Sequence, residues 1–105
     1  MNAQNIATQL MKHCANEPTA EVHWYAGGAV DYRFWTGEYM LTASVFTEEE
    51  DRNEAGKWPS MGVVGGNWGM IIDYEGPEYN TDAGAVRAAI ALMAEMRRDY
   101  GGKHD

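Results

Sequence analysis

The sequence predicts one compact α+β domain over residues 1–105. Its core is a four-stranded antiparallel sheet (meander) with N- and C-terminal helices packed on one face, in the order α-β-β-β-β-α. Three observations predict this fold. Apolar residues recur at helical spacing near both ends, they alternate with polar residues in the middle, and glycine-containing turns separate the alternating runs. Short turns between successive strands favour antiparallel pairing, and the apolar face of such a sheet needs helices to cover it.

The first helix is predicted over residues 3–15, and Pro18 stops it soon afterwards. Its apolar positions share one face: Ala3, Ile6, Ala7, Leu10 and Cys14. The second helix begins after Thr81, a good N-cap, with Asp82 in its first turn. Its apolar stripe consists of Val86, Ala89, Ile90, Met93 and Tyr100.

Three runs with a period of two predict the first three strands, at residues 20–25, 30–35 and 39–46. A three-residue turn, Gly27-Gly28-Ala29, would set Trp24 opposite Tyr32. A two-residue turn, Thr36-Gly37, would set Phe34 opposite Tyr39. With these registers the apolar side chains of neighbouring strands fall on the same face of the sheet.

A fourth strand is predicted from Trp68 to Tyr74, because alternate residues there are apolar. Residues 47–66 show no clear period, and we expect a long loop, with a short strand around residues 61–64 as an option. The glycine-rich stretch 62–69 lacks the Gly-Lys-Ser/Thr ending of a phosphate-binding loop and leads into a strand instead of a helix. A turn or bulge is therefore expected there.

Charge excludes several classes of protein. The 105 residues carry 16 acidic and 8 basic side chains, for a formal net charge of -8. Direct nucleic-acid binding by phosphate neutralisation needs a basic face, so it is not expected, and a membrane-surface role is disfavoured for the same reason. The absence of a long apolar run and of a signal-peptide pattern predicts a cytoplasmic protein, in the host cytoplasm if a phage encodes it.

Residues suited to catalysis or metal binding are sparse. His13 and Cys14 are neighbours on a predicted helix, which turns their side chains about 100° apart and prevents a nucleophile–base pair. His23 has no second ligand at metal spacing. Asp73 and Glu75 are the best carboxylate pair for hydrolysis, but we expect solvated residues near a strand end. No catalytic residue, metal or cofactor is therefore predicted.

The sheet face that the helices leave uncovered is the most informative feature. Aromatic residues and a methionine stand there among charged residues, which is typical of a protein-binding surface. Tyr25, Trp35 and Phe46 would be its anchors. Closure of this face by Trp58, or by a homodimer, is the competing interpretation. The predicted face displays Glu21, His23, Tyr25, Asp31, Arg33, Trp35, Glu38, Met40 and Phe46, with Ile71 and Asp73 as further candidates.

An acidic run follows the third strand. Its carboxylates are Glu48, Glu49, Glu50, Asp51 and Glu54. Such a run is commonly a solvated loop that aids solubility. If it flanks the aromatic face, however, it forms a negative rim suited to a basic partner. We therefore include these residues in the predicted partner-binding surface.

These observations predict a small, acidic, non-enzymatic inhibitor that binds a basic partner, one that handles nucleic acid, by presenting carboxylates where that partner expects phosphates. Phage anti-defence proteins, including anti-CRISPR inhibitors, are similar in size, acidity and lack of catalytic motifs, although no residue motif carries this resemblance. An immunity protein or antitoxin fits nearly as well. The sequence also leaves open a ligand-binding or hydrolytic domain that uses the glycine-rich stretch with Asp73 or Glu75, and a homo-oligomer that buries Trp35 and Phe46.

Overall fold

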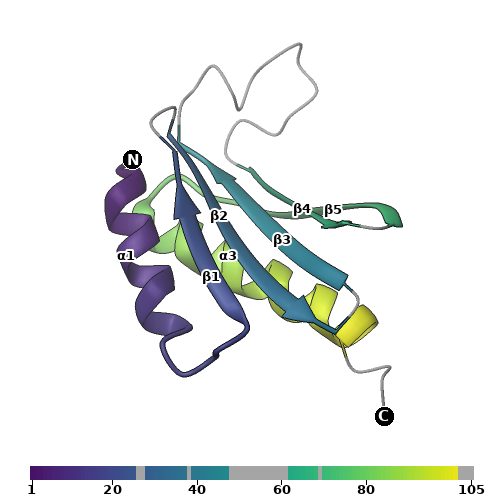
Figure 1. The fold of residues 1–105 in the computed structure, drawn as a ribbon. Helices are drawn as coiled ribbons and strands as arrows, with labels where there is room; N and C mark the ends of the chain where they lie inside the picture. The colour runs from purple at the N-terminus through teal and green to yellow at the C-terminus, as the bar shows by residue number, and fades with distance from the viewer. Residues whose placement is uncertain (26–27, 38, 48–61, 69, 102–105) are drawn as a thin grey trace.

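The computed structural model describes residues 1–25, 28–37, 39–47, 62–68 and 70–101 of the chain. These residues form two layers, a twisted antiparallel sheet and two helices packed on one of its faces (Figure 1). The helices are α1 (Ala3–His13) and α3 (Asp82–Met96), and a turn of π-helix, η2 (Arg97–Gly101), continues α3. The strands are β1 (Ala20–Trp24), β2 (Ala29–Thr36), β3 (Tyr39–Phe46), β4 (Gly62–Trp68) and β5 (Met70–Glu78), and they lie side by side in that order.

The predicted α+β class, the antiparallel meander and the placement of both terminal helices on one face are confirmed. The sheet holds one strand more than the predicted order. The short strand that the sequence left as an option around residues 61–64 is present as β4, and it extends through the glycine-rich stretch to Trp68, where a turn or bulge was expected. The predicted fourth strand corresponds to β5, which begins at Met70, whereas Trp68 is the last residue of β4.

Close packing of α3 on the sheet explains one of the glycines of β4, Gly65. A Cβ added at Gly65 would lie 2.9 Å from both Leu92 Cδ2 and Met96 Sδ of α3. Glycine in a strand often marks such a close approach, and here it lets the helix lie directly against β4.

The first hairpin has a register two residues away from the predicted one. Trp24 lies opposite Val30, whereas the predicted turn set it opposite Tyr32. The pairing continues past β1, because the Tyr25 N–H donates to the Ala29 carbonyl at 2.9 Å. A shift by an even number of residues leaves every side chain on its predicted face, since side chains alternate with a period of two.

The second hairpin shows the same kind of difference. Phe34 lies opposite Leu41 and not opposite Tyr39, because pairing extends to Thr36 opposite Tyr39. The turn therefore begins one residue later than predicted, at Gly37. The φ of Gly37 is +67°, a left-handed conformation that glycine adopts without steric cost.

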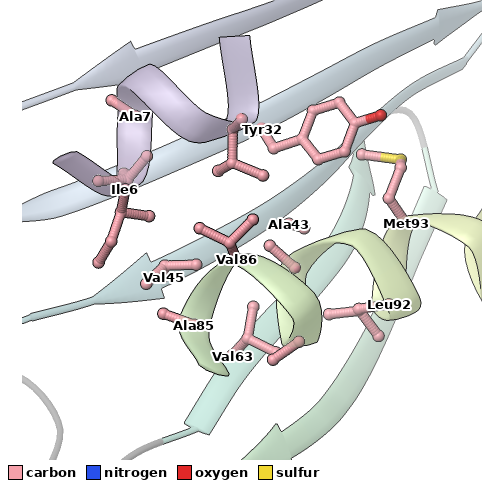
Figure 2. Packing of buried hydrophobic residues seen from close by; sticks show 14 of the residues in the cluster. Ile6, Ala7, Tyr32, Ala43, Val45, Val63, Ala85, Val86, Leu92 and Met93 are labelled. Atoms are coloured by element: carbon pink, nitrogen blue, oxygen red, sulfur yellow. The ribbon is translucent and has the colours of Figure 1, made fainter. Parts of the chain in front are cut away.

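The hydrophobic core lies between the sheet and the two helices, and Figure 2 shows its central part. Ile6 of α1 and Leu92 of α3 pack there with Val45 and Val63 from the sheet. Tyr32 of β2 is also buried, and this burial raises the pKa of its hydroxyl to about 12. Apolar burial of this kind is the main stabilising contribution to the fold.

The helix ends follow the sequence signals. The Asn2 side chain accepts a hydrogen bond from the Asn5 N–H at the start of α1, and the predicted N-cap Thr81 accepts one from the Gly84 N–H at 3.0 Å. The first helix is two residues shorter than predicted, because it ends at His13. Within the described residues, neither helix has the length and apolar character required to span a membrane.

Candidate protein-binding face

The helices cover one face of the sheet, and we call the opposite face the open face. Strand alternation assigns its residues. On β1 and β2 the register sets an acidic residue opposite a basic one, Glu21 opposite Arg33 and His23 opposite Asp31. The open-face positions of β1, β2 and β3, with the residue after β1, are Glu21, His23, Tyr25, Asp31, Arg33, Trp35, Met40, Thr42, Ser44 and Phe46.

Glu21 holds the first of two hydrogen-bonded groups on the open face. The Trp35 Nε1–H donates to Glu21 Oε1 at 3.0 Å, and His23 Nε2 lies 2.7 Å from Glu21 Oε2. These two contacts lower the pKa of the Glu21 carboxyl, and the hydrogen bond from Trp35 has the larger effect. The Trp35 side chain is 45% exposed although its N–H is bonded. The indole ring is therefore presented to solvent in a fixed orientation.

Asp31 holds the second group. Ser44 Oγ donates to Asp31 Oδ1 at 2.9 Å, and Arg33 Nη2 donates to Asp31 Oδ2 at 3.2 Å. Arg33 Nη2 also donates to the Tyr25 hydroxyl at 2.8 Å, and that hydroxyl donates to Asp31 Oδ2 at 3.3 Å. Tyr25 is 45% exposed, like Trp35. Both groups thus combine a fixed carboxylate with an exposed aromatic ring.

Two polar atoms between these groups are buried without a hydrogen-bond partner among the described residues. They are Arg33 Nε and Thr42 Oγ1, and the two residues lie directly opposite each other on β2 and β3. A buried polar group without a hydrogen-bond partner costs free energy. Both atoms lie beneath the surface of the open face, out of reach of solvent.

Phe46, the third predicted anchor, lies at the end of β3 and is only partly exposed. The Tyr79 hydroxyl bridges its backbone, accepting from the Phe46 N–H and donating to the Phe46 carbonyl, both at 2.9 Å. Phe46 lies opposite Ala29, whose carbonyl accepts from the Tyr25 N–H. Phe46 and Tyr25 therefore flank the same end of the open face, whereas Trp35 lies at the other end.

Met40 corrects the sequence-based description of this face. It was expected to be displayed there, but only 4% of it is exposed. It lies opposite Trp35 in the central strand β3, which has neighbours on both sides, and side chains on a central strand are shielded more than those at an edge. Met40 therefore lies on the open face but is buried there, so its side chain is not accessible to a partner.

The remaining predicted residues divide into two sets. Asp73 and Glu75 lie inside β5, opposite Gly66 and Val64, and not near a strand end as expected. The described residues contain no group of three or more His, Cys, Asp or Glu side chains that could hold a metal ion. The second set lies outside the described residues and stays a prediction: Glu38, Glu48, Glu49, Glu50, Asp51, Glu54 and Trp58.

Sequence reasoning left Thr42 and Ser44 out of the residues that form the open face. Their positions in the alternating run of β3 placed them on this face, but their small polar side chains carried no functional signal. The hydrogen bond from Ser44 to Asp31 appears only once the register is known, because it joins residues on two different strands.

Comparisons with protein-family models, curated proteins and solved structures found no match for this chain. The geometry and charge of the open face are therefore the basis for proposing a function.

Proposed function

We propose that this protein binds a basic protein through its open face and thereby blocks that partner. The carrying observation is the pair of exposed aromatic side chains, Trp35 and Tyr25, each fixed by a hydrogen-bonded carboxylate, Glu21 or Asp31. Aromatic residues contribute strongly to binding at protein interfaces. Because these rings are already oriented, binding would cost little conformational entropy.

Charge supports a basic partner. The net charge of -8 attracts a positively charged surface and accelerates encounter with it. The acidic run Glu48–Glu54 follows β3 by one residue, so it continues the chain from the end of the open face where Phe46 lies. A partner that handles nucleic acid carries the basic surface that such carboxylates would occupy. The proposed class is an inhibitor of the phage anti-defence kind, an anti-CRISPR-like protein or nucleic-acid mimic; an immunity protein or antitoxin would use the same surface.

A matched pair of tryptophans tests the surface. Trp35 is 45% exposed on the open face, and Trp24 is 44% exposed but has its side chain on the opposite side of its strand. Wild-type, Trp35→Ala and Trp24→Ala proteins would be immobilised as baits for lysates, and captured proteins identified by mass spectrometry. We expect basic proteins that the wild type and Trp24→Ala retain and Trp35→Ala loses, since a central aromatic anchor contributes about 2 kcal/mol or more. If both variants captured the same proteins, the open face would be excluded as the binding surface.

Salt and charge neutralisation test the mechanism with the purified partner. Binding measured by calorimetry should weaken steeply with ionic strength, because exposed charges are screened within about 10 Å at 0.1 M salt. Changing Glu48, Glu49 and Glu50 to Gln together with Asp51 to Asn should weaken it further. If this quadruple variant binds as tightly as the wild type, charge mimicry is wrong.

A further inference from the structure

The outer edge of β1 carries backbone groups with no strand beside them in the described part of the chain. β1 is the first strand of the sheet and pairs only with β2 there. The Tyr25 N–H donates to Ala29 and the Trp35 N–H to the Thr19 carbonyl, so residues 19, 21, 23 and 25 face β2. In an antiparallel pair the residues between them point the other way. Ala20, Val22 and Trp24 therefore direct their N–H and C=O groups outward.

Two of the exposed large apolar side chains lie at the end of this strand. Trp24 is the last residue of β1 and is 44% exposed, and Tyr25 follows it and is 45% exposed. Because successive residues of an extended chain point to opposite faces of the sheet, these two aromatic side chains flank the β1 edge from both sides.

We propose that two copies of this chain pair through the outer edge of β1, antiparallel and centred on Val22. The Ala20 N–H already donates to the Glu17 carbonyl at 3.1 Å, so Val22 and Trp24 hold the outward N–H groups that need acceptors. A two-fold axis through Val22 gives both of these N–H groups an acceptor in the partner strand. Each Val22 N–H reaches the partner's Val22 carbonyl, and each Trp24 N–H reaches the partner's Ala20 carbonyl.

In this register each side chain of β1 lies opposite a complementary side chain of the partner's β1. On the open face Glu21 lies opposite the partner's His23, and His23 lies opposite the partner's Glu21, so a carboxylate faces an imidazole on both sides of the axis. On the other face the small Ala20 lies opposite the partner's Trp24, which leaves room for the indole. A second copy of this chain therefore fits the edge better than an arbitrary extended peptide.

Helix α1 adds to the same interface. His13 packs edge-on against Tyr32 of β2 at 6.3 Å between ring centroids, which fixes the inward flank of α1. Met11 lies about 200° around the helix from His13 and is 48% exposed, so it is on the outward flank. Because α1 contacts β1 and β2, pairing of the two β1 edges would bring the two copies of α1 onto the same side of the joined sheet, next to the two-fold axis. Met11 would then lie between them.

The main test measures self-association of the full chain by analytical ultracentrifugation between about 1 µM and about 1 mM, the range of weak interfaces. The wild type should form a dimer. Val22→Pro should be monomeric yet folded, since the outward Val22 N–H makes no bond to β2. Val22→Ala loses the same core packing but keeps the N–H, so it should still dimerise. A wild-type monomer throughout, or a dimer that persists in Val22→Pro, would overturn the proposal.

A charge swap tests the register. Glu21→Lys should weaken the dimer about tenfold, because two cross-strand pairs are lost. Combining it with His23→Glu places a lysine opposite a glutamate on both sides of the axis and should restore the dimer. Glu95→Lys, an equal charge change on an exposed α3 residue, should not weaken it. If the double variant is no better than Glu21→Lys alone, the Val22 register is wrong.

The response to salt distinguishes this dimer from the proposed binding of a basic partner. Each copy carries a net charge of -8, so screening should strengthen self-pairing while it weakens binding to a basic partner. Dimerisation can therefore be confirmed even if binding to a basic partner is not found, and the reverse also holds. A dimer that weakens as salt rises would contradict pairing between two like-charged copies.

Discussion

Arg97 shows how one side chain at the end of α3 ties three parts of the fold together. Its guanidinium lies 3.9 Å from the centroid of the Phe34 ring in β2. Its Nη1 also donates to both carboxylate oxygens of Glu17, at 3.0 and 3.3 Å, in the connection between α1 and β1. The stacking of the planar guanidinium on an aromatic face favours arginine over lysine at this position.

Replacing Arg97 by Met should therefore lower the free energy of unfolding by about 1 kcal/mol, a value that allows for partial solvent exposure of this ion pair. Arg98 is the matched control, since its side chain is 73% exposed and contacts only the neighbouring Asp99 among the described ion pairs. Urea unfolding of Arg97→Met and Arg98→Met would measure the difference. Equal effects of the two substitutions would contradict a special role for Arg97.

Sequence patterns could place some of these residues and not others. Alternation put Tyr25 and Trp35 on the uncovered face, and both are exposed there. The same pattern could not show that Met40 is buried, because shielding depends on the strands on either side. For Arg97 the sequence indicated only a basic residue in the last helical turn; its contact with Phe34 depends on how α3 crosses the sheet.

At the scale of the elements, Asp82 joins the beginnings of the two helices. The Asn2 N–H donates to Asp82 Oδ1 at 3.0 Å, and Asn5 Nδ2 donates to Oδ2 at 2.8 Å. These hydrogen bonds lower the pKa of the Asp82 carboxyl, and the one from Asn5 has the larger effect. The carboxylate thus lies in the first turn of α3, where the helix dipole favours negative charge, and it also holds the start of α1 against α3.

Asp82→Asn should reduce the free energy of unfolding at pH 7 by about 1 kcal/mol. Because the folded chain has the lower pKa, the stabilisation is complete above the usual Asp value of about 4 and is lost as the pH falls below it. Urea unfolding from pH 7 to pH 2 should show the wild type and Asp82→Asn converging at low pH. Glu95→Gln, which changes an exposed carboxylate on the same helix, should show no such convergence, and a constant difference for Asp82→Asn would refute the role.

The contact between β4 and α3 makes another prediction at this scale. Gly65→Ala should destabilise the fold by about 1 kcal/mol, because the added methyl group meets the flexible ends of the Leu92 and Met96 side chains, which must shift. Gly66 faces the other side of the strand, so Gly66→Ala should cost less. Thermal unfolding of both variants would test this, and an equal loss of stability would contradict close packing at Gly65.

The strand registers show where sequence reasoning works at this scale. Both hairpins were predicted two residues away from their true pairing, yet the faces were correct because the error was even. For β4 the sequence indicated only an optional short strand around residues 61–64 and a turn or bulge after it, since glycine is common in turns and its use against α3 is a tertiary effect. Local patterns thus predicted faces and helix starts, whereas registers and the extra strand depended on packing.

At the scale of the whole molecule, the two faces of the sheet have different roles. One face is filled by α1 and α3, and the sequence predicted this from the two amphipathic segments at the ends of the chain. The other carries carboxylates, histidine, arginine and aromatic rings in two hydrogen-bonded groups. The sequence predicted most members of this face but not their contacts, because each group draws on more than one strand.

The Thr47 N–H and hydroxyl both donate to the Gly28 carbonyl, so the chain leaves β3 at a fixed point. It enters β4 beside that point, since Val45 lies opposite Val63. Closing a loop between two fixed, adjacent ends costs only slightly more as the loop grows. Changes in the length or the sequence of the stretch between these two ends, residues 48–61, should therefore cost the domain little stability.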